Sequence, residues 1–160
     1  MSSIIAPAKR VNLVPAGIAG GIIGGVLIHA FLLSISGFHV AILYQWIASN
    51  LVGKAAFGST AYVGLGLLLH FLVAAAWGVI YALVAQCGRP ALVNRPLPSG
   101  LLFGLVVLVV MQAVQVAFHT YVAPSQNWAQ YALLVAAHLV FFGLPVALYV
   151  SAAARKAVAS

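Results

Sequence analysis

The sequence predicts an all-α membrane protein whose four transmembrane helices form a bundle. Of its 160 residues, 65% are hydrophobic and 4% charged, and none is Asp or Glu, whereas soluble domains carry roughly 25% charged residues. A helix needs about 20 apolar residues to cross a bilayer, and four stretches without Lys or Arg are this long. They cover about 14–38, 60–86, 98–122 and 129–153, so a single membrane domain spans the chain, 1–160.

The first and third spans are rich in glycine at helical spacing. Small residues four apart let two helix backbones approach closely inside a membrane. The first span carries five of them and the third begins with two, so we expect these residues to pack against other helices: Gly17, Gly20, Gly21, Gly24, Gly25, Gly100 and Gly104.

Two connections have a composition of their own. In the segment 40–59 apolar residues such as Trp46 and Leu51 alternate with polar ones, which predicts a short amphipathic helix at the outer membrane interface. The segment 89–99 holds Pro90, Pro96 and Pro98; because proline breaks helices, we expect an extended cytoplasmic linker between two halves of the chain.

The basic residues predict the orientation. Cytoplasmic loops retain Lys and Arg, and six of the seven cations fall on one side of four alternating spans: Lys9, Arg10, Arg89, Arg95, Arg155 and Lys156. Only Lys54 falls on the other. We therefore expect both termini in the cytoplasm, with the cations among anionic lipid headgroups. The cations form no run or stripe interleaved with aromatic residues, which disfavours nucleic-acid binding.

The two halves resemble each other, with candidate repeats at 9–88 and 89–156. At an offset of 80 residues, Gly20 and Gly24 fall on Gly100 and Gly104, and Phe38-His39 on Phe118-His119. At an offset of 68, His70 and Tyr81 fall on His138 and Tyr149. Because both halves start on the same side, this predicts two parallel-repeat helix pairs around a pseudo-two-fold axis along the membrane normal.

Polar side chains at membrane depth are the candidate functional residues. Counted at about 1.5 Å per residue from the outer ends of the spans, one polar residue from each helix lies near the same depth: His29, His70, Gln112 and His138. A second pair, His39 and His119, lies nearer the outer surface.

Three interpretations of this midplane layer stay open. The side chains could hydrogen-bond across helices and fix their register. His70 and His138, on the second and fourth helices, could hold a haem b iron, an arrangement similar to the diagonal ligands of the cytochrome b family. His29, His70 and His138 could bind zinc or copper, although no carboxylate or thiol is near to orient the rings.

Enzyme activity is not expected, because general acid and base catalysis would depend on histidine alone. From about 65 to 156 the pattern resembles small bacterial inner-membrane proteins of the YagU type, a family of unknown function. The resemblance rests on the stretch from His70 to Tyr81, on the helix start at Gly100 to Gly104 with His119, and on Ala137-His138-Leu-Val-Phe-Phe. It implies a bacterial inner-membrane location and no reaction.

Two hypotheses on function follow. The first is a non-enzymatic accessory or structural subunit of a larger, respiratory-type membrane complex or a homo-oligomer, docked through its glycine-rich faces and outer amphipathic segment. The second is an electron-transfer subunit that binds haem b or a quinone with the midplane histidines.

Overall fold

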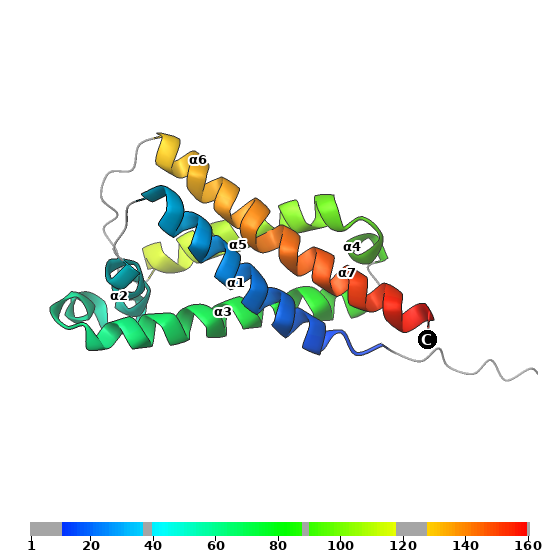
Figure 1. Cartoon of the computed structure of the whole chain (residues 1–160), viewed down its shortest axis with the longest axis horizontal. Helices are drawn as coiled ribbons and strands as arrows, with labels where there is room; N and C mark the ends of the chain where they lie inside the picture. The colour runs from blue at the N-terminus through cyan, green and yellow to red at the C-terminus, as the bar shows by residue number, and fades with distance from the viewer. Residues whose placement is uncertain (1–10, 37–39, 88–89, 118–127, 160) are drawn as a thin grey trace, which may run out of the picture.

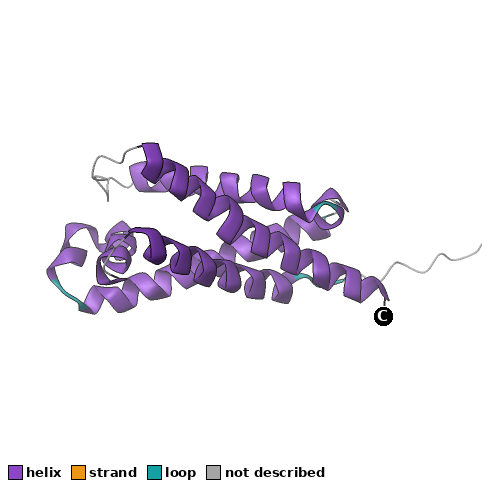
Figure 2. Ribbon diagram, turned by 45° about the horizontal axis from the view of Figure 1, so that its top comes forward, coloured by secondary structure: helices purple, strands orange, loops and turns teal. Residues whose placement is uncertain are grey.

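The computed structural model describes residues 11–36, 40–87, 90–117 and 128–159, and these contain helices and short connections without a strand (Figures 1 and 2). The elements in chain order are α1 (Val14–Ser36), α2 (Val40–Val52), the 3-10 helix η1 (Gly53–Gly58), α3 (Ala61–Gln86), α4 (Pro90–Asn94), α5 (Pro96–Ala117), α6 (Trp128–Ala136), the π-helix η2 (Ala137–Gly143) and α7 (Leu144–Ala159).

Within these described ranges, four helical segments are long and apolar enough to cross a membrane, which confirms the predicted spans. They are α1, α3, α5 and the continuous run of α6, η2 and α7, hereafter the fourth span. The predicted ends of the first span at 38 and of the third at 122 lie outside the described residues. The protein is therefore a multi-pass membrane protein.

The spans are arranged so that α1 and the fourth span lie in the centre. On one side α1 packs along α3, on the other along η2 and α7, and α5 covers the far side of η2 and α7 (Figure 1). Between α3 and α5 the contact is made by aromatic rings, with Phe103 at 4.9 Å from Tyr81 and 6.1 Å from Trp77 between ring centroids.

Glycine brings α1 and α3 into backbone contact. Gly17 and Gly21 on α1 face Gly78 and Ala74 on α3, and a Cβ at Gly78 would lie 2.9 Å from the carbonyl carbon of Gly17. No side chain fits there, because carbon atoms normally approach to about 3.5–4.0 Å. The sequence analysis missed Gly78, although Ala74, Gly78 and Ala82 repeat the four-residue spacing of the first span.

Glycines of α1 and of α5 pack against the fourth span from two sides. Gly20 and Gly24 of α1 face Val146 and Phe142, while Gly100 and Gly104 of α5 face Gly143 and the backbone of η2. The predicted glycine faces are thus covered by helices of the same chain. This corrects the expectation that they dock another protein. The matched glycines of the two candidate repeats contact the same span, and the duplication itself stays a prediction.

The connection at 89–99 differs from the extended linker that its prolines suggested. Pro90 begins the short helix α4, and Pro96 and Pro98 lie in the first turn of α5. That expectation was wrong because proline is disruptive only inside a helix; in the first turn its missing N–H has no partner to lose and its fixed φ suits the helix.

Buried hydroxyl groups hold α4 against the bundle. The Tyr81 hydroxyl donates to the Leu92 carbonyl at 2.9 Å, and Ser151 Oγ donates to the Val93 carbonyl at 2.5 Å. Tyr81 is 2% exposed and Ser151 fully buried. The last carbonyls of a helix lack partners within it, so these two bonds satisfy groups that the short helix leaves open.

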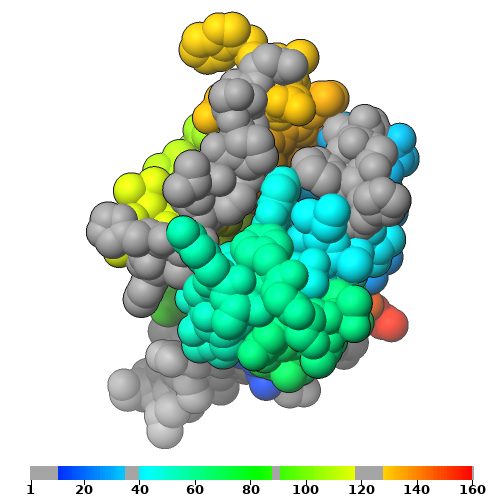
Figure 3. Space-filling view, turned by 90° about the vertical axis from the view of Figure 1, so that its left-hand side faces the viewer, coloured from blue at the N-terminus to red at the C-terminus, as the bar shows by residue number. Residues whose placement is uncertain are grey.

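The described cations separate to the two ends of the bundle. Arg95 follows α4, and Arg155 and Lys156 lie in the last turns of α7, at the end where α1 begins and α3 ends; we call this the basic end. Lys54 lies in η1 at the opposite end, where α2, η1 and the start of α3 form one continuous surface (Figure 3).

The helix predicted for the first outer loop is present as α2. It packs along the first half of α3, with the Tyr44 backbone against Gly66. Its buried residues are Tyr44, Gln45, Ala48 and Ser49, whereas Leu51 is 66% exposed. The helix therefore turns small and polar residues toward the protein and large apolar ones toward the surroundings.

Candidate functional site

A pair of histidines in ring contact forms the centre of the polar layer. His29 of α1 and His70 of α3 have ring centroids 3.8 Å apart, at an interplanar angle of 40°. His29 is 6% exposed and His70 half-buried. Gly25, one turn before His29, provides the space, because a Cβ there would lie 3.1 Å from His70 Nε2.

A hydrogen bond fixes the proton position on His70, and a second one joins His29 to Tyr44. His70 Nε2 lies 3.1 Å from the Gly25 carbonyl oxygen, and since a carbonyl only accepts, His70 donates from Nε2. Its Nδ1 is then an acceptor when the ring is neutral. His29 Nδ1 lies 3.4 Å from the Tyr44 hydroxyl, whose ring meets the imidazole edge-on at a centroid distance of 4.9 Å.

Tyr44 joins α2 to this layer and was missed by the sequence analysis, which took the larger apolar residues of 40–59 as the membrane-facing side. It is 8% exposed, and burial raises the pKa of its phenol, because a buried phenolate loses its hydration. The neutral hydroxyl therefore persists next to His29. A signal was present in the sequence, because Tyr44 is the single tyrosine of the segment 40–59.

His138 belongs to the layer but makes a bond within its own helix. Its Nδ1 donates to the Leu134 carbonyl at 2.9 Å, and it lies one turn before Phe142, which packs against Gly24 beside the Gly25 that contacts His70. His138 lies near the start of η2, where the fourth span has π-helix geometry and which ends two residues before Pro145. Short π segments often occur at functional sites.

Gln112 contributes from α5 but joins none of these bonds. Its side chain is half-buried, and the described residues offer no hydrogen-bond partner to it. The structure thus brings His29, His70 and His138 near one another and leaves Gln112 apart. His39 and His119, the second predicted pair, lie outside the described residues.

The three histidines do not fit a metal ion as they are arranged. Within the described part of the chain, no group of three His, Cys, Asp or Glu side chains could hold a metal. His29 and His70 present ring faces to each other rather than nitrogen atoms to a common point.

Haem ligation by His70 and His138 meets a similar difficulty. In His70, the Nε2 that would bind iron is hydrogen-bonded to the Gly25 carbonyl. The His29 ring packs on the same imidazole. His138 alone has the usual ligand orientation, with Nδ1–H on a carbonyl and Nε2 directed elsewhere. Haem would therefore require the His29–His70 contact to separate.

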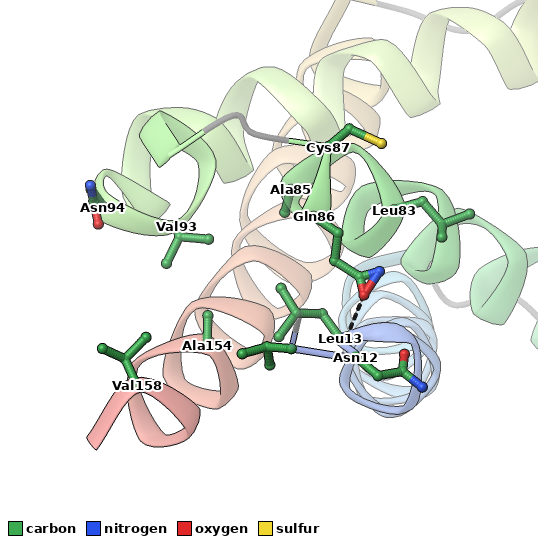
Figure 4. A pocket seen from close by; sticks show the side chains of 11 residues that line it. Asn12, Leu13, Leu83, Ala85, Gln86, Cys87, Val93, Asn94, Ala154 and Val158 are labelled. Atoms are coloured by element: carbon green, nitrogen blue, oxygen red, sulfur yellow. Dashed lines mark hydrogen bonds between the residues drawn. The ribbon is translucent and has the colours of Figure 1, made fainter. Parts of the chain in front are cut away.

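A pocket of about 900 Å³ opens at the basic end of the bundle (Figure 4). Its walls come from the start of α1, the end of α3, α4 and the end of α7, and are mostly apolar. Gln86 reaches across it, its Oε1 accepting the backbone N–H of Leu13 at 2.7 Å. Asn12 Oδ1 accepts the N–H of Val14 at 3.0 Å.

Comparison with protein-family models, with curated proteins and with solved structures finds no match for the chain. The resemblance to the YagU type stays a prediction.

Proposed function

We propose that this multi-pass membrane protein is a non-enzymatic accessory subunit of a larger membrane complex in the bacterial inner membrane. The observation that supports this most is the internal pairing of the polar layer. His29 contacts Tyr44 and His70, and His70 and His138 bond to backbone carbonyls. The contacts between helices, from His29 to Tyr44 and from His70 to His29 and the Gly25 carbonyl, are worth about 0.6–2 kcal/mol each in membranes, so they fix the register of α1, α2 and α3.

Orientation with both termini in the cytoplasm is part of this proposal. The positive-inside rule places the end richer in Lys and Arg in the cytoplasm. Among the described residues the basic end carries Arg95, Arg155 and Lys156, and the opposite end Lys54. Cys87, exposed at the basic end, is the single cysteine of the chain and supplies a native label for this test.

The face offered to a partner is the outward side of α5. α3 is flanked by α1 and α2, whereas α5 has extensive contact with the fourth span alone. Several large aliphatic side chains on α5 are exposed, including Leu102 at 62% and Val109 at 58%. In a membrane such a face is covered by lipid or by helices of another subunit, and the tight glycine contacts are already used inside the chain.

Co-isolation from native membranes tests the proposal. A tagged protein solubilised in mild detergent is expected to carry a fixed set of other membrane proteins. Leu102→Trp is expected to release them, because the larger side chain protrudes from the α5 face that contacts the partner. Leu68→Trp is expected to keep them, since Leu68 is similarly exposed at 57% but lies on α3. A free monomer or homodimer, or equal loss in both variants, contradicts the proposal.

The electron-transfer alternative is favoured by one observation, the free Nε2 of His138 near His70. It is opposed by the bond that holds His70 Nε2. It predicts a coloured preparation, whereas the accessory subunit is colourless.

A further inference from the structure

The pocket at the basic end has a chemistry that the subunit role does not use. Its apolar wall residues come from the segment that leads into α1 and from α3, α4 and α7: Val11, Leu13, Leu83, Ala85, Val93, Ala154 and Val158. Three amide side chains, Asn12, Gln86 and Asn94, and the Cys87 thiol complete the lining. An apolar hollow with a few polar groups is the usual form of a small-molecule site.

The amide groups of Gln86 and Asn12 offer hydrogen-bond donors to the pocket rather than acceptors. The amide oxygens of Gln86 and Asn12 are occupied by the N–H groups of Leu13 and Val14. Their amide nitrogens carry two N–H donors each, and no hydrogen bond joins these nitrogens to another described residue. A ligand that accepts hydrogen bonds is therefore complementary to them.

The positive charges near the pocket favour an anionic ligand. Arg95 follows the lining residue Asn94, and Arg155 follows the lining residue Ala154; both arginines are exposed, as is Lys156. The chain has no Asp or Glu to neutralise them and a net charge of +7. Each cation next to an anionic membrane surface is worth about 1 kcal/mol. An anion with apolar chains is therefore complementary to the apolar walls, the amide donors and the nearby cations.

We infer that this pocket binds an anionic phospholipid, with its phosphate among the Gln86 and Asn12 amides and its glycerol and first acyl carbons against the apolar walls. The inference depends on the proposed orientation only for the choice of leaflet. Binding itself is measured in detergent, where orientation and partner subunits play no part, so its failure leaves the proposed function untouched.

Gln86→Glu is the variant that isolates the donors. The carboxylate still accepts the Leu13 N–H and keeps that contact, but it removes the free amide donors and adds a negative charge. Gln130→Glu makes the same charge change on α6, in the other half of the fourth span from the α7 residues that line the pocket, and serves as the matched control. Losing 1.4 kcal/mol corresponds to a tenfold weaker affinity, and we expect Gln86→Glu to lose at least about that.

The experiment is native mass spectrometry of the delipidated protein with added phosphatidylglycerol or phosphatidylcholine, together with the rate of Cys87 alkylation. We expect phosphatidylglycerol to bind the wild type and Gln130→Glu, to bind Gln86→Glu at least tenfold less, and to slow Cys87 alkylation. Inorganic phosphate alone is expected not to slow it.

Three results would overturn the inference. Equal binding of the two lipids would remove the role of charge. Unchanged binding in Gln86→Glu would place the lipid elsewhere. Protection of Cys87 without lipid, lost when residues 1–8 are deleted, would show that the chain itself fills the pocket.

Discussion

Replacing Gly78 by alanine tests the close backbone contact between α1 and α3. The added Cβ would lie 2.9 Å from the Gly17 carbonyl carbon and 3.0 Å from the Gly21 nitrogen. Ordinary contacts are about 3.5–4.0 Å, and the Gly17 carbonyl oxygen lies closer still, so α1 and α3 must separate by at least about 0.5–1 Å. A gap of this size forfeits roughly a quarter to a half of each dispersion contact along the interface, and overpacking costs about 1–3 kcal/mol.

The assay is reversible unfolding in mixed micelles of increasing sodium dodecyl sulfate content, followed by circular dichroism. We expect Gly78→Ala to lower the free energy of unfolding by about 1–3 kcal/mol. The control is Gly64→Ala in the same helix, where an added Cβ meets nothing within 4 Å; it should be neutral or stabilise by up to about 1 kcal/mol. Equal stability of the two variants would refute the packing argument.

Two further predictions concern tyrosines. Tyr81→Phe removes the donor to the half-buried Leu92 carbonyl and should lower the free energy of unfolding by about 0.5–1.5 kcal/mol, whereas the same change at Tyr149, 44% exposed, should leave it nearly unchanged; equal effects contradict the α4 contact. Tyr44, whose pKa burial raises, should ionise above the ordinary value of about 10, as an absorbance titration compared with Tyr44→Phe would show. Because the pKa is raised in the folded protein, the contribution of Tyr44 to stability is fully present below its pKa in the unfolded chain and is lost as the pH rises through its pKa in the folded protein. Ionisation at the ordinary pH would show that the phenol is not buried.

The limits of the spans could be predicted because bilayer thickness constrains them directly. The predicted starts at 14 and 60 and the end at 86 agree closely with α1 and α3, since an apolar run must be about as long as the hydrocarbon core is thick. The count of residues from the span ends likewise placed His29 and His70 at a similar depth, and their rings are in contact.

The facing of each helix could not be predicted, because a span that is apolar on all sides carries little information on its rotation. Gly20 and Gly24 face the fourth span, whereas Gly17 and Gly21 of the same helix face α3, although Gly21 directly follows Gly20. Gln112 shares the depth of the histidines but not their contacts. In α2, large apolar residues mark the exposed side, the reverse of a soluble helix, so Tyr44 was overlooked.

The central claim is that the midplane histidines bind one another and the backbone rather than a cofactor. A reduced-minus-oxidised visible spectrum of the protein purified from membranes of haem-replete cells tests it most directly. We predict no haem α-band. An α-band that disappears in both His70→Leu and His138→Leu would contradict the claim and establish the electron-transfer alternative.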